Sequence, residues 1–361
     1  MQWLLLIFIT PYIYLLSRIY KSLTQIKYYH SQSIPGRFLS IVVACRNEEK
    51  NLPVLLRHLS EQDYDPDFFE ILIIDDNSND KTSAIASGFE GMNNLVVLQN
   101  SDRGKKSAIR QGISVSKGSL IVTTDADCRM GKSWLKTIAS FFEENKPEMI
   151  ILPVEMEEGM GFFRRFQQLE FLSLQGITAG TALRGRPVMC NGANLAFTKE
   201  VYNRYSGNLH DELISGDDVF LLHGIKSDPG NKIMWLESAE ARVSTITSET
   251  LSAFFRQRAR WISKAGAYKD RFTRILGIVT FAAVFLQLSL LVAGIFNPVY
   301  LWVFLAAFLI KSSVDYLIVM NTATRYGKRQ LIKWFPLSGI IYPFYVLLVV
   351  ISYFVPAEMK K

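Results

Sequence analysis

The chain has 361 residues, of which 49% are apolar and only 20% are charged, and 24 of them are phenylalanines. This composition suits a globular domain joined to membrane segments better than a wholly soluble enzyme. The formal net charge of +7 is compatible with a nucleic acid, an anionic membrane surface or an anionic substrate. Because no nucleic-acid-binding motif is present and much of the basic excess flanks apolar segments, we expect a membrane and no nucleic acid.

An apolar segment opens the chain, and basic residues follow it. Residues 3–16 are almost wholly apolar, and Arg18 and Lys21 come next. A cleaved signal peptide has the opposite order, so we expect a retained transmembrane anchor over residues 1–21, with its C-terminal side in the cytosol. The segment reaches the roughly 20 residues needed for a span only when it is extended to Tyr20.

Strand-like and helical patterns alternate along the next part of the chain. Apolar, β-branched runs predict strands at 39–44, 71–74, 95–98 and 120–123. Helical spacing predicts helices between them, at 49–60, 81–88 and 105–116. This alternation indicates an α/β domain with a parallel sheet covered on both faces, which we place within residues 37–245. Ligands of such sheets bind beyond the carboxyl ends of the strands.

Three of these strands end in polar and acidic residues. The sequence is CRNEE after the first strand, DDNSND after the second and TTDADC near the end of the fourth. Each stretch alone is weak evidence, since Asp and Asn end strands and cap helices in many proteins, and Asp80 fits such a cap. Together they predict that acidic residues converge on one edge of the sheet.

Two carboxylates, Asp125 and Asp127, stand one residue apart at the end of the fourth strand. In extended backbone such residues point the same way, so their charges would repel each other. A divalent cation relieves this repulsion, and we expect Mg²⁺ or Mn²⁺ with substrate phosphates in the remaining coordination positions. Lys105 and Lys106 follow Gly104 at a predicted helix start, where they would favour an anion; a solvated basic turn is the alternative.

Three more apolar segments lie near the C-terminus, at 275–296, 299–320 and about 335–355. We therefore expect a membrane region of about three helices over residues 271–356. Basic residues precede the first of these segments and separate the second from the third, so the positive-inside rule places 22–273 in the cytosol. The three cysteines fit a reduced, cytosolic domain because they are few and widely spaced.

The apolar segments contain a few residues that need an explanation. Pro336 and Pro343 leave open whether the last segment spans fully or is broken. Lys311 and Asp315 lie four residues apart, which favours an ion pair on one helical face over a direct substrate role.

Two stretches combine bulky apolar and basic residues at helical spacing. One is GFFRRFQQLEFLSL at 161–174, and the other is 251–265, within a predicted amphipathic helix region at 246–270. Both patterns are compatible with helices lying in the membrane interface. Ordinary amphipathic helices packed on the sheet are the alternative.

The region 39–261 resembles the membrane-bound, processive-type branch of glycosyltransferase family 2. The resemblance rests on VVACRNEEKNL, IIDDNSNDKT, TTDADC, SGDDVFLL and QRARW, and the last of these has the family's Q-x-x-R-W form. The same short motif set is similar to that of ceramide glucosyltransferases. The resemblance implies a GT-A-type nucleotide-binding domain with a mixed, mainly parallel sheet, joined to transmembrane helices.

The resemblance also implies roles for nucleotide-sugar-binding residues. Glu48 and Asp76 would contact the nucleoside, and Lys105 would lie near the nucleotide. Asp125 and Asp127 would hold the diphosphate-bound metal.

Two later motifs complete the implied site. Asp218 would be the general base, with a helix cap as the alternative role, and Asp217 stands where the family commonly has Glu, which makes it a second candidate. The side chains that would border the diphosphate and acceptor are Gln257, Arg258, Arg260 and Trp261, although Trp261 could equally pack in a core.

These observations predict an integral membrane, inverting glycosyltransferase of the bacterial inner membrane, with its catalytic domain in the cytosol. It would move a hexose from a nucleoside-diphosphate sugar, for which the resemblance implies UDP, to a lipid or glycan hydroxyl. We favour a lipid-linked acceptor, because about four spans with few polar residues can hardly enclose a glycan channel. The alternatives are a processive polysaccharide synthase, a membrane-anchored nucleotidyltransferase, and a scaffold or transporter without catalysis.

Overall fold

The chain forms two compact units in the computed structural model, which describes residues 2–31, 36–210, 213 and 215–354. Unit 1 comprises Met1–Ile26, Glu158–Val188 and Thr247–Lys361, and unit 2 comprises Lys27–Glu157 and Met189–Ile246. The range 37–245, predicted as one catalytic domain, therefore includes a segment, Glu158–Val188, that packs with the helices of unit 1.

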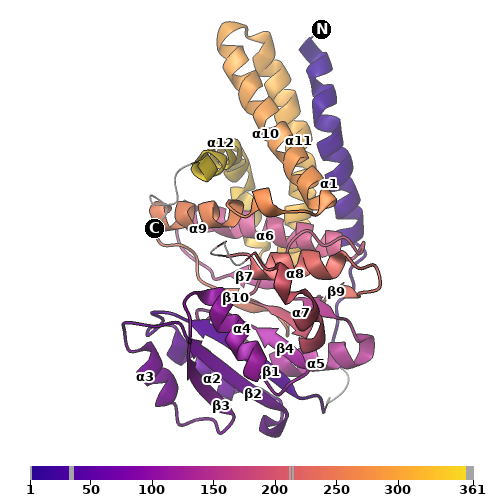
Figure 1. Cartoon of the computed structure of the whole chain (residues 1–361). Coiled ribbons are helices and arrows are strands. Elements are labelled where there is room, and N and C mark those ends of the chain that lie inside the picture. Colours follow the sequence, from indigo (N-terminus) through magenta and orange to yellow (C-terminus); the bar gives the residue numbers. More distant parts are fainter. Residues whose placement is uncertain (1, 32–35, 211–212, 214, 355–361) are drawn as a thin grey trace. The chain divides into compact units, whose positions relative to one another are not determined.

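Unit 2 is built on a seven-stranded sheet with the order β3-β2-β1-β4-β8-β6-β9 (Figure 1). Its strands are β1 (Leu39–Cys45), β2 (Phe69–Asp75), β3 (Leu95–Gln99), β4 (Leu120–Thr123), β6 (Met149–Ile151), β8 (Leu195–Thr198) and β9 (Ile233–Trp235). The first four strands in this list are parallel, β8 is antiparallel to both its neighbours, and β6 and β9 are parallel to each other. The prediction of a mixed, mainly parallel sheet is confirmed.

A second, three-stranded sheet in unit 2 has the order β5-β10-β7. It consists of β5 (Arg129–Met130), β7 (Val154–Met156) and β10 (Val243–Thr245). Because β5 follows the TTDADC stretch closely, this small sheet brings the segment around Thr245 to the end of β4.

The described part of unit 2 contains the three helices predicted at 49–60, 81–88 and 105–116, together with three helices outside those ranges. They are α2 (Leu52–Ser60), α3 (Thr82–Ser87), α4 (Lys105–Val115), α5 (Trp134–Asn145), α7 (Lys199–Tyr205) and α8 (Asp217–Lys226), with short 3₁₀ turns at Pro66–Phe68 and Ser206–Asn208. Gly112 allows α4 to approach the sheet closely, since a Cβ atom there would lie 2.5 Å from Val42 Cγ1 and 3.2 Å from Ile74 Cγ1. This close packing fixes the start of α4, and with it Lys105, against β1 and β2.

Unit 1 is helical. Its elements are η1 (Gln2–Ile9), α1 (Thr10–Leu23), α6 (Phe162–Ala182), α9 (Leu251–Ile262), η4 (Ala265–Ala267), α10 (Arg271–Phe296), α11 (Val299–Arg325), η5 (Arg329–Trp334) and α12 (Phe335–Phe354). Within the described residues, four of its helical segments are long and apolar enough to cross a membrane: Gln2–Leu23, Arg271–Phe296, Val299–Arg325 and Arg329–Ser352. They match the four apolar segments predicted from the sequence, and α12 continues as one helix through Pro343.

The central helix of unit 1 is α6, which packs on α1 and α11 (Figure 1). Two glycines make this contact close. A Cβ atom at Gly180 would lie 2.7 Å from the Ile19 carbonyl oxygen, and one at Gly176 would lie 2.4 Å from Thr322 Oγ1. Much of α6 is buried in unit 1, and its location in a membrane interface stays a prediction.

Candidate active site

The ends of the parallel strands bring the predicted acidic stretches to one edge of the sheet in unit 2. Cys45, at the end of β1, pairs in register with Asp75, at the end of β2. The Asp76 amide donates a hydrogen bond to the Cys45 carbonyl (2.7 Å), and the Thr124 amide donates one to the Val42 carbonyl (3.5 Å). The segments that follow β1, β2 and β4 therefore leave the sheet side by side.

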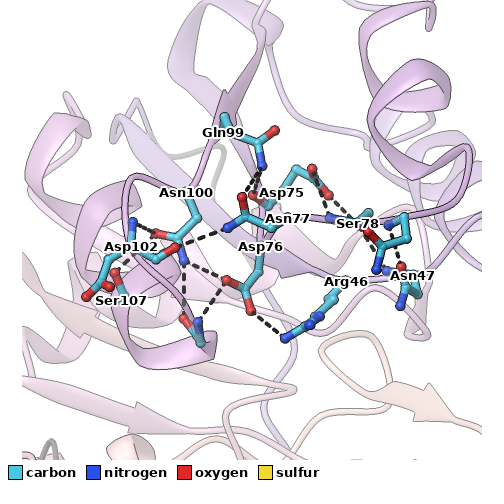
Figure 2. Close-up of polar contacts among 12 residues, drawn as sticks. Arg46, Asn47, Asp75, Asp76, Asn77, Ser78, Gln99, Asn100, Asp102 and Ser107 are labelled. Atoms are coloured by element: carbon cyan, nitrogen blue, oxygen red, sulfur yellow. Dashed lines mark hydrogen bonds and ion pairs between the residues drawn. The ribbon is translucent and has the colours of Figure 1, made fainter.

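Asp76 is buried at this edge and organises the loop that leads into α4 (Figure 2). Its Oδ1 accepts hydrogen bonds from Asn100 Nδ2 and from the Gly104 amide, both at 2.8 Å. Its Oδ2 lies 3.8 Å from Arg46 Nη1. Gly104 has a φ angle of 100°, which glycine adopts without strain. Asp76 thus ties the end of β2 to the first residues of α4.

The loops after β1 and β2 are held together by side chains. Asn47 Oδ1 accepts a hydrogen bond from the Asn79 amide (2.8 Å), and the Glu49 amide donates one to Asp80 (3.2 Å). Asp80 also accepts from the Thr82 amide at 3.0 Å, so it satisfies the first backbone donor of α3 as predicted, although the N-cap position itself is Lys81.

Glu48 lies among these loops and near the acidic residues that follow β4. Its Oε2 accepts a hydrogen bond from Asn51 Nδ2 at 2.8 Å, and its amide donates one to Thr82 Oγ1 at 2.7 Å. Burial raises the pKa of the Glu48 carboxyl, the Asn51 hydrogen bond opposes that rise, and the negative charges of Asp127 and Asp125 add to it. Glu48 thus belongs electrostatically to the same acidic cluster.

Lys105 supplies a positive charge within this cluster. Its Nζ atom lies 2.5 Å from Asp125 Oδ1. Burial opposes the protonated form, but the nearby carboxylates of Asp125, Asp217 and Asp218 outweigh it and raise the pKa of Lys105. The ammonium group is therefore charged across the physiological range and faces carboxylates from two parts of the chain.

Asp127 is half-buried, and its negative charge is neutralised less than the charge of Asp125. Its Oδ2 accepts a hydrogen bond from Thr245 Oγ1 at 3.0 Å. Burial and then the charge of Asp125 raise the pKa of Asp127, whereas Thr245 and Lys105 lower it. Two carboxylates that repel each other in this way fit the predicted cation, since Mg²⁺ is commonly held by one or two carboxylates together with substrate phosphates. Among the described residues no group of three or more His, Cys, Asp or Glu side chains is arranged to hold a metal.

Asp217 and Asp218 begin α8 and line a pocket together with Lys105. Asp218 Oδ2 accepts a hydrogen bond from the Gly192 amide (3.0 Å), and its Oδ1 accepts one from the Val219 amide (2.8 Å). These bonds fix the position of the Asp218 carboxylate. The structure thus joins the SGDDVFLL motif to Lys105 and, through it, to Asp125.

The Q-x-x-R-W residues lie on α9, in unit 1, where Arg258 is buried. Its guanidinium makes a two-pronged ion pair with Glu170 of α6, at 2.5 and 3.2 Å, and lies over the ring of Trp261 at 4.1 Å. Gln257 accepts a further bond from Arg258 at 2.5 Å, and Arg260 is exposed. Arg258 therefore ties α9 to α6 and holds Trp261.

Several residues of the site carry no recognisable sequence motif. Asn100, Thr245 and Gly192 hold Asp76, Asp127 and Asp218, respectively. Each comes from a segment distant in sequence from its partner. The position of Asn100 directly after β3 is a sequence signal for its role, because the polar residues after β1, β2 and β4 mark the same edge of the sheet.

Residues 40–205 match the family model "Glycosyl transferase family 2". The chain carries a glycosyltransferase family 2 domain. This match includes the sheet edge with Glu48, Asp76, Lys105, Asp125 and Asp127. The matched region agrees with the family that the sequence motifs resemble.

Curated relatives match a shorter part of this domain. Beta-monoglucosyldiacylglycerol synthase of Trichormus variabilis is 34% identical over 113 residues, 30% of this chain and 24% of that protein. Human dolichyl-phosphate beta-glucosyltransferase is 40% identical over 105 residues, 26% of this chain and 32% of that protein. Undecaprenyl-phosphate 4-deoxy-4-formamido-L-arabinose transferase of Aeromonas hydrophila is 35% identical over 95 residues, 25% of this chain and 29% of that protein. The aligned region thus spans about a quarter to a third of these relatives.

A solved structure with a similar fold is the mannosyltransferase PcManGT from Pyrobaculum calidifontis in complex with GDP-Man and Mn²⁺. The TM-score is 0.54 with 17% sequence identity, and the match covers 96% of this chain and 99% of that one. The likeness shows a shared fold, and together with the family match it confirms the predicted GT-A type.

We predict that Asn100→Ala destabilises the protein and loosens the start of α4. The substitution removes the donor to the buried Asp76 carboxylate and the acceptor of the Ser107 hydroxyl, at 3.1 Å. The cost of such unsatisfied groups is about 1–3 kcal/mol. A thermal melt of the full-length protein in detergent should show a clearly lower Tm.

The matched control is Asn203→Ala, because Asn203 is exposed on α7. Its Tm should equal that of the unmodified chain. Equal melting of all three proteins would mean that the Asp76–Asn100 bond does not hold this loop.

Proposed function

We propose that this protein is a membrane-bound, metal-dependent, inverting glycosyltransferase that moves a hexose from a nucleoside-diphosphate sugar to a lipid-linked hydroxyl. The observation that carries the proposal is the arrangement of Asp125, Asp217 and Asp218 around Lys105 at the carboxyl edge of a family 2 sheet. Formation of a polysaccharide, or transfer of the nucleotide in place of the sugar, would contradict this proposal.

The donor would bind at the sheet edge. Glu48 and Asp76 would contact the nucleoside, as the resemblance implies, and UDP is the nucleotide we propose on the same ground. Lys105 would neutralise the diphosphate, since its ammonium group already faces carboxylates and would exchange one anionic partner for another. This supports a donor with an anionic leaving group.

The residues that would hold the metal are Asp125 and Asp127. Bound there with the diphosphate, Mg²⁺ or Mn²⁺ would stabilise the negative charge on the leaving group. PcManGT is described with GDP-Man and Mn²⁺, which supports a divalent cation in this fold.

Asp218 would be the general base. The acceptor oxygen would attack the anomeric carbon while the bond from that carbon to the diphosphate oxygen breaks, its electron pair leaving with the diphosphate. The Asp218 carboxylate would take the hydroxyl proton. A single displacement of this kind inverts the anomeric configuration.

The other proposed roles rest on the resemblance and the named relatives. Gln257, Arg258, Arg260 and Trp261 would contribute to diphosphate or acceptor binding, with Arg258 holding Trp261 in place. The relatives' names include diacylglycerol, dolichyl-phosphate and undecaprenyl-phosphate, which supports a lipid acceptor. We place the enzyme in the bacterial inner membrane with unit 2 in the cytosol, following the distribution of basic residues.

We predict that Mn²⁺ with a nucleoside diphosphate raises the Tm of the unmodified protein, and that EDTA reverses the rise. Asp127→Asn should abolish this rise and the transferase activity, because it removes a charged ligand. Thermal melts with and without the ions test this separately from activity. Unchanged activity in EDTA would remove the metal from the mechanism.

We predict that Asp218→Asn retains nucleotide binding but lowers the transfer rate about 10²–10⁴-fold, because the amide cannot accept the hydroxyl proton. Asp217→Asn should lower it less, which makes it the paired control on the same helix turn. Single-turnover assays with a panel of nucleotide sugars measure the rates. The opposite order of the two variants would assign the base to Asp217.

The acceptor is tested by the size of the product. The protein in vesicles, supplied with radiolabelled nucleotide sugars, should yield an organic-soluble lipid that carries a single sugar. A long water-soluble glycan would indicate the processive alternative. Release of inorganic pyrophosphate would indicate nucleotidyl transfer instead.

A further inference from the structure

Unit 1 contains a cavity that the proposed transfer chemistry does not use. Its walls come from α1, α6, α10, α11 and α12, and it encloses about 800 Å³, including the part that is open to the surroundings. Four of these helices, α1, α10, α11 and α12, belong to the described segments that are long and apolar enough to cross a membrane.

The charged groups in the wall of this cavity are already neutralised. Lys311 Nζ lies 2.6 Å from Asp315 Oδ2, which confirms the predicted ion pair. The Tyr12 hydroxyl donates a hydrogen bond to Asp315 Oδ1 at 2.5 Å. Glu170, also in the wall, is paired with Arg258. The cavity therefore offers no excess positive charge to an anionic ligand.

Two neutral polar side chains in the wall lack hydrogen-bond partners among the described residues. Gln287 is only 1% exposed, and neither its amide oxygen nor its amide nitrogen is bonded. The Ser338 hydroxyl is also buried and unbonded. Polar groups that lack partners in an apolar protein region are costly, so such groups commonly satisfy their hydrogen bonds with a ligand or water.

The rest of the wall is suited to hydrocarbon. Leu16, Phe166, Phe308 and Val319 line it beside the polar groups. A ligand that fills the cavity must therefore combine an apolar body with a few neutral donors and acceptors. Water alone would leave these apolar side chains without apolar contacts.

We propose that this cavity binds the headgroup of a neutral, hydroxyl-bearing lipid, of which diacylglycerol is the simplest form. Gln287 and Ser338 would hydrogen-bond the hydroxyl and ester oxygens, and the apolar wall would contact the acyl chains. A neutral lipid matches this wall better than a phosphate-bearing one, because two carboxylates, Asp315 and Glu170, lie in the wall and the buried Lys311 ammonium group is already paired with Asp315. Binding at this site is independent of the proposed transfer, since a lipid can be held here whether or not it receives a sugar.

The test uses the full-length protein in nanodiscs with a photoactivatable diacylglycerol, followed by peptide mapping of the labelled positions. Label is expected on peptides of α10, α11 or α12. Gln287→Leu should lower this labelling about fivefold, the effect of losing one ordinary hydrogen bond. Ser338→Ala removes a single oxygen atom and should also lower it, which keeps the test valid if Gln287→Leu does not fold.

The matched control is Ser289→Leu, because Ser289 is exposed on the same helix two residues away. Its labelling should equal that of the unmodified protein. Labelling that is unaffected by both cavity variants would overturn the site. Equal labelling of the same peptides by a photoactivatable phosphatidic acid would overturn the assignment to a neutral lipid.

Discussion

The attraction between Lys105 and the carboxylates around it is the interaction on which the candidate active site depends. Asp125 comes from the end of β4, and Asp217 and Asp218 come from the start of α8. Without a positive charge among them, these groups would repel one another. Lys105 offsets part of this negative charge in the absence of substrate, and an incoming diphosphate would compete with the carboxylates for the same ammonium group.

The position of Lys105 depends on two contacts made by neighbouring residues, one within α4 and one just before it. Gly112 lets the helix lie against Val42 and Ile74, and Asp76 holds the amide of Gly104 just before the helix begins. The end of β2 therefore sets both the position of the Asp76 carboxylate and the first residues of α4. A change in either contact would shift the charge that the acidic residues share, although neither contact involves a reacting atom.

Much of this edge could be predicted from the sequence because its determinants are local. The apolar runs give the strands of this edge within one or two residues, and the pair Asp125/Asp127 depends on a spacing of two. In unit 1, the ion pair between Lys311 and Asp315 likewise depends on a spacing of four. Long-range choices could not be predicted. Helix α6 has ordinary amphipathic spacing, yet its Gly176 and Gly180 fit the surfaces of α11 and α1 and place it in unit 1.

The charge balance of the two units points to ligands of different kinds. In unit 2 the carboxylates outnumber the Lys105 ammonium group, which suits a cation and an anionic nucleotide bound together. In the cavity of unit 1 each charged wall group has an oppositely charged partner, and among the described residues the buried amide of Gln287 and the buried hydroxyl of Ser338 lack hydrogen-bond partners. Neutral groups of this kind recognise a ligand through hydrogen bonds and add no charge to the cavity. A water-soluble, charged donor and a neutral lipid would therefore be recognised by opposite electrostatic means within one chain.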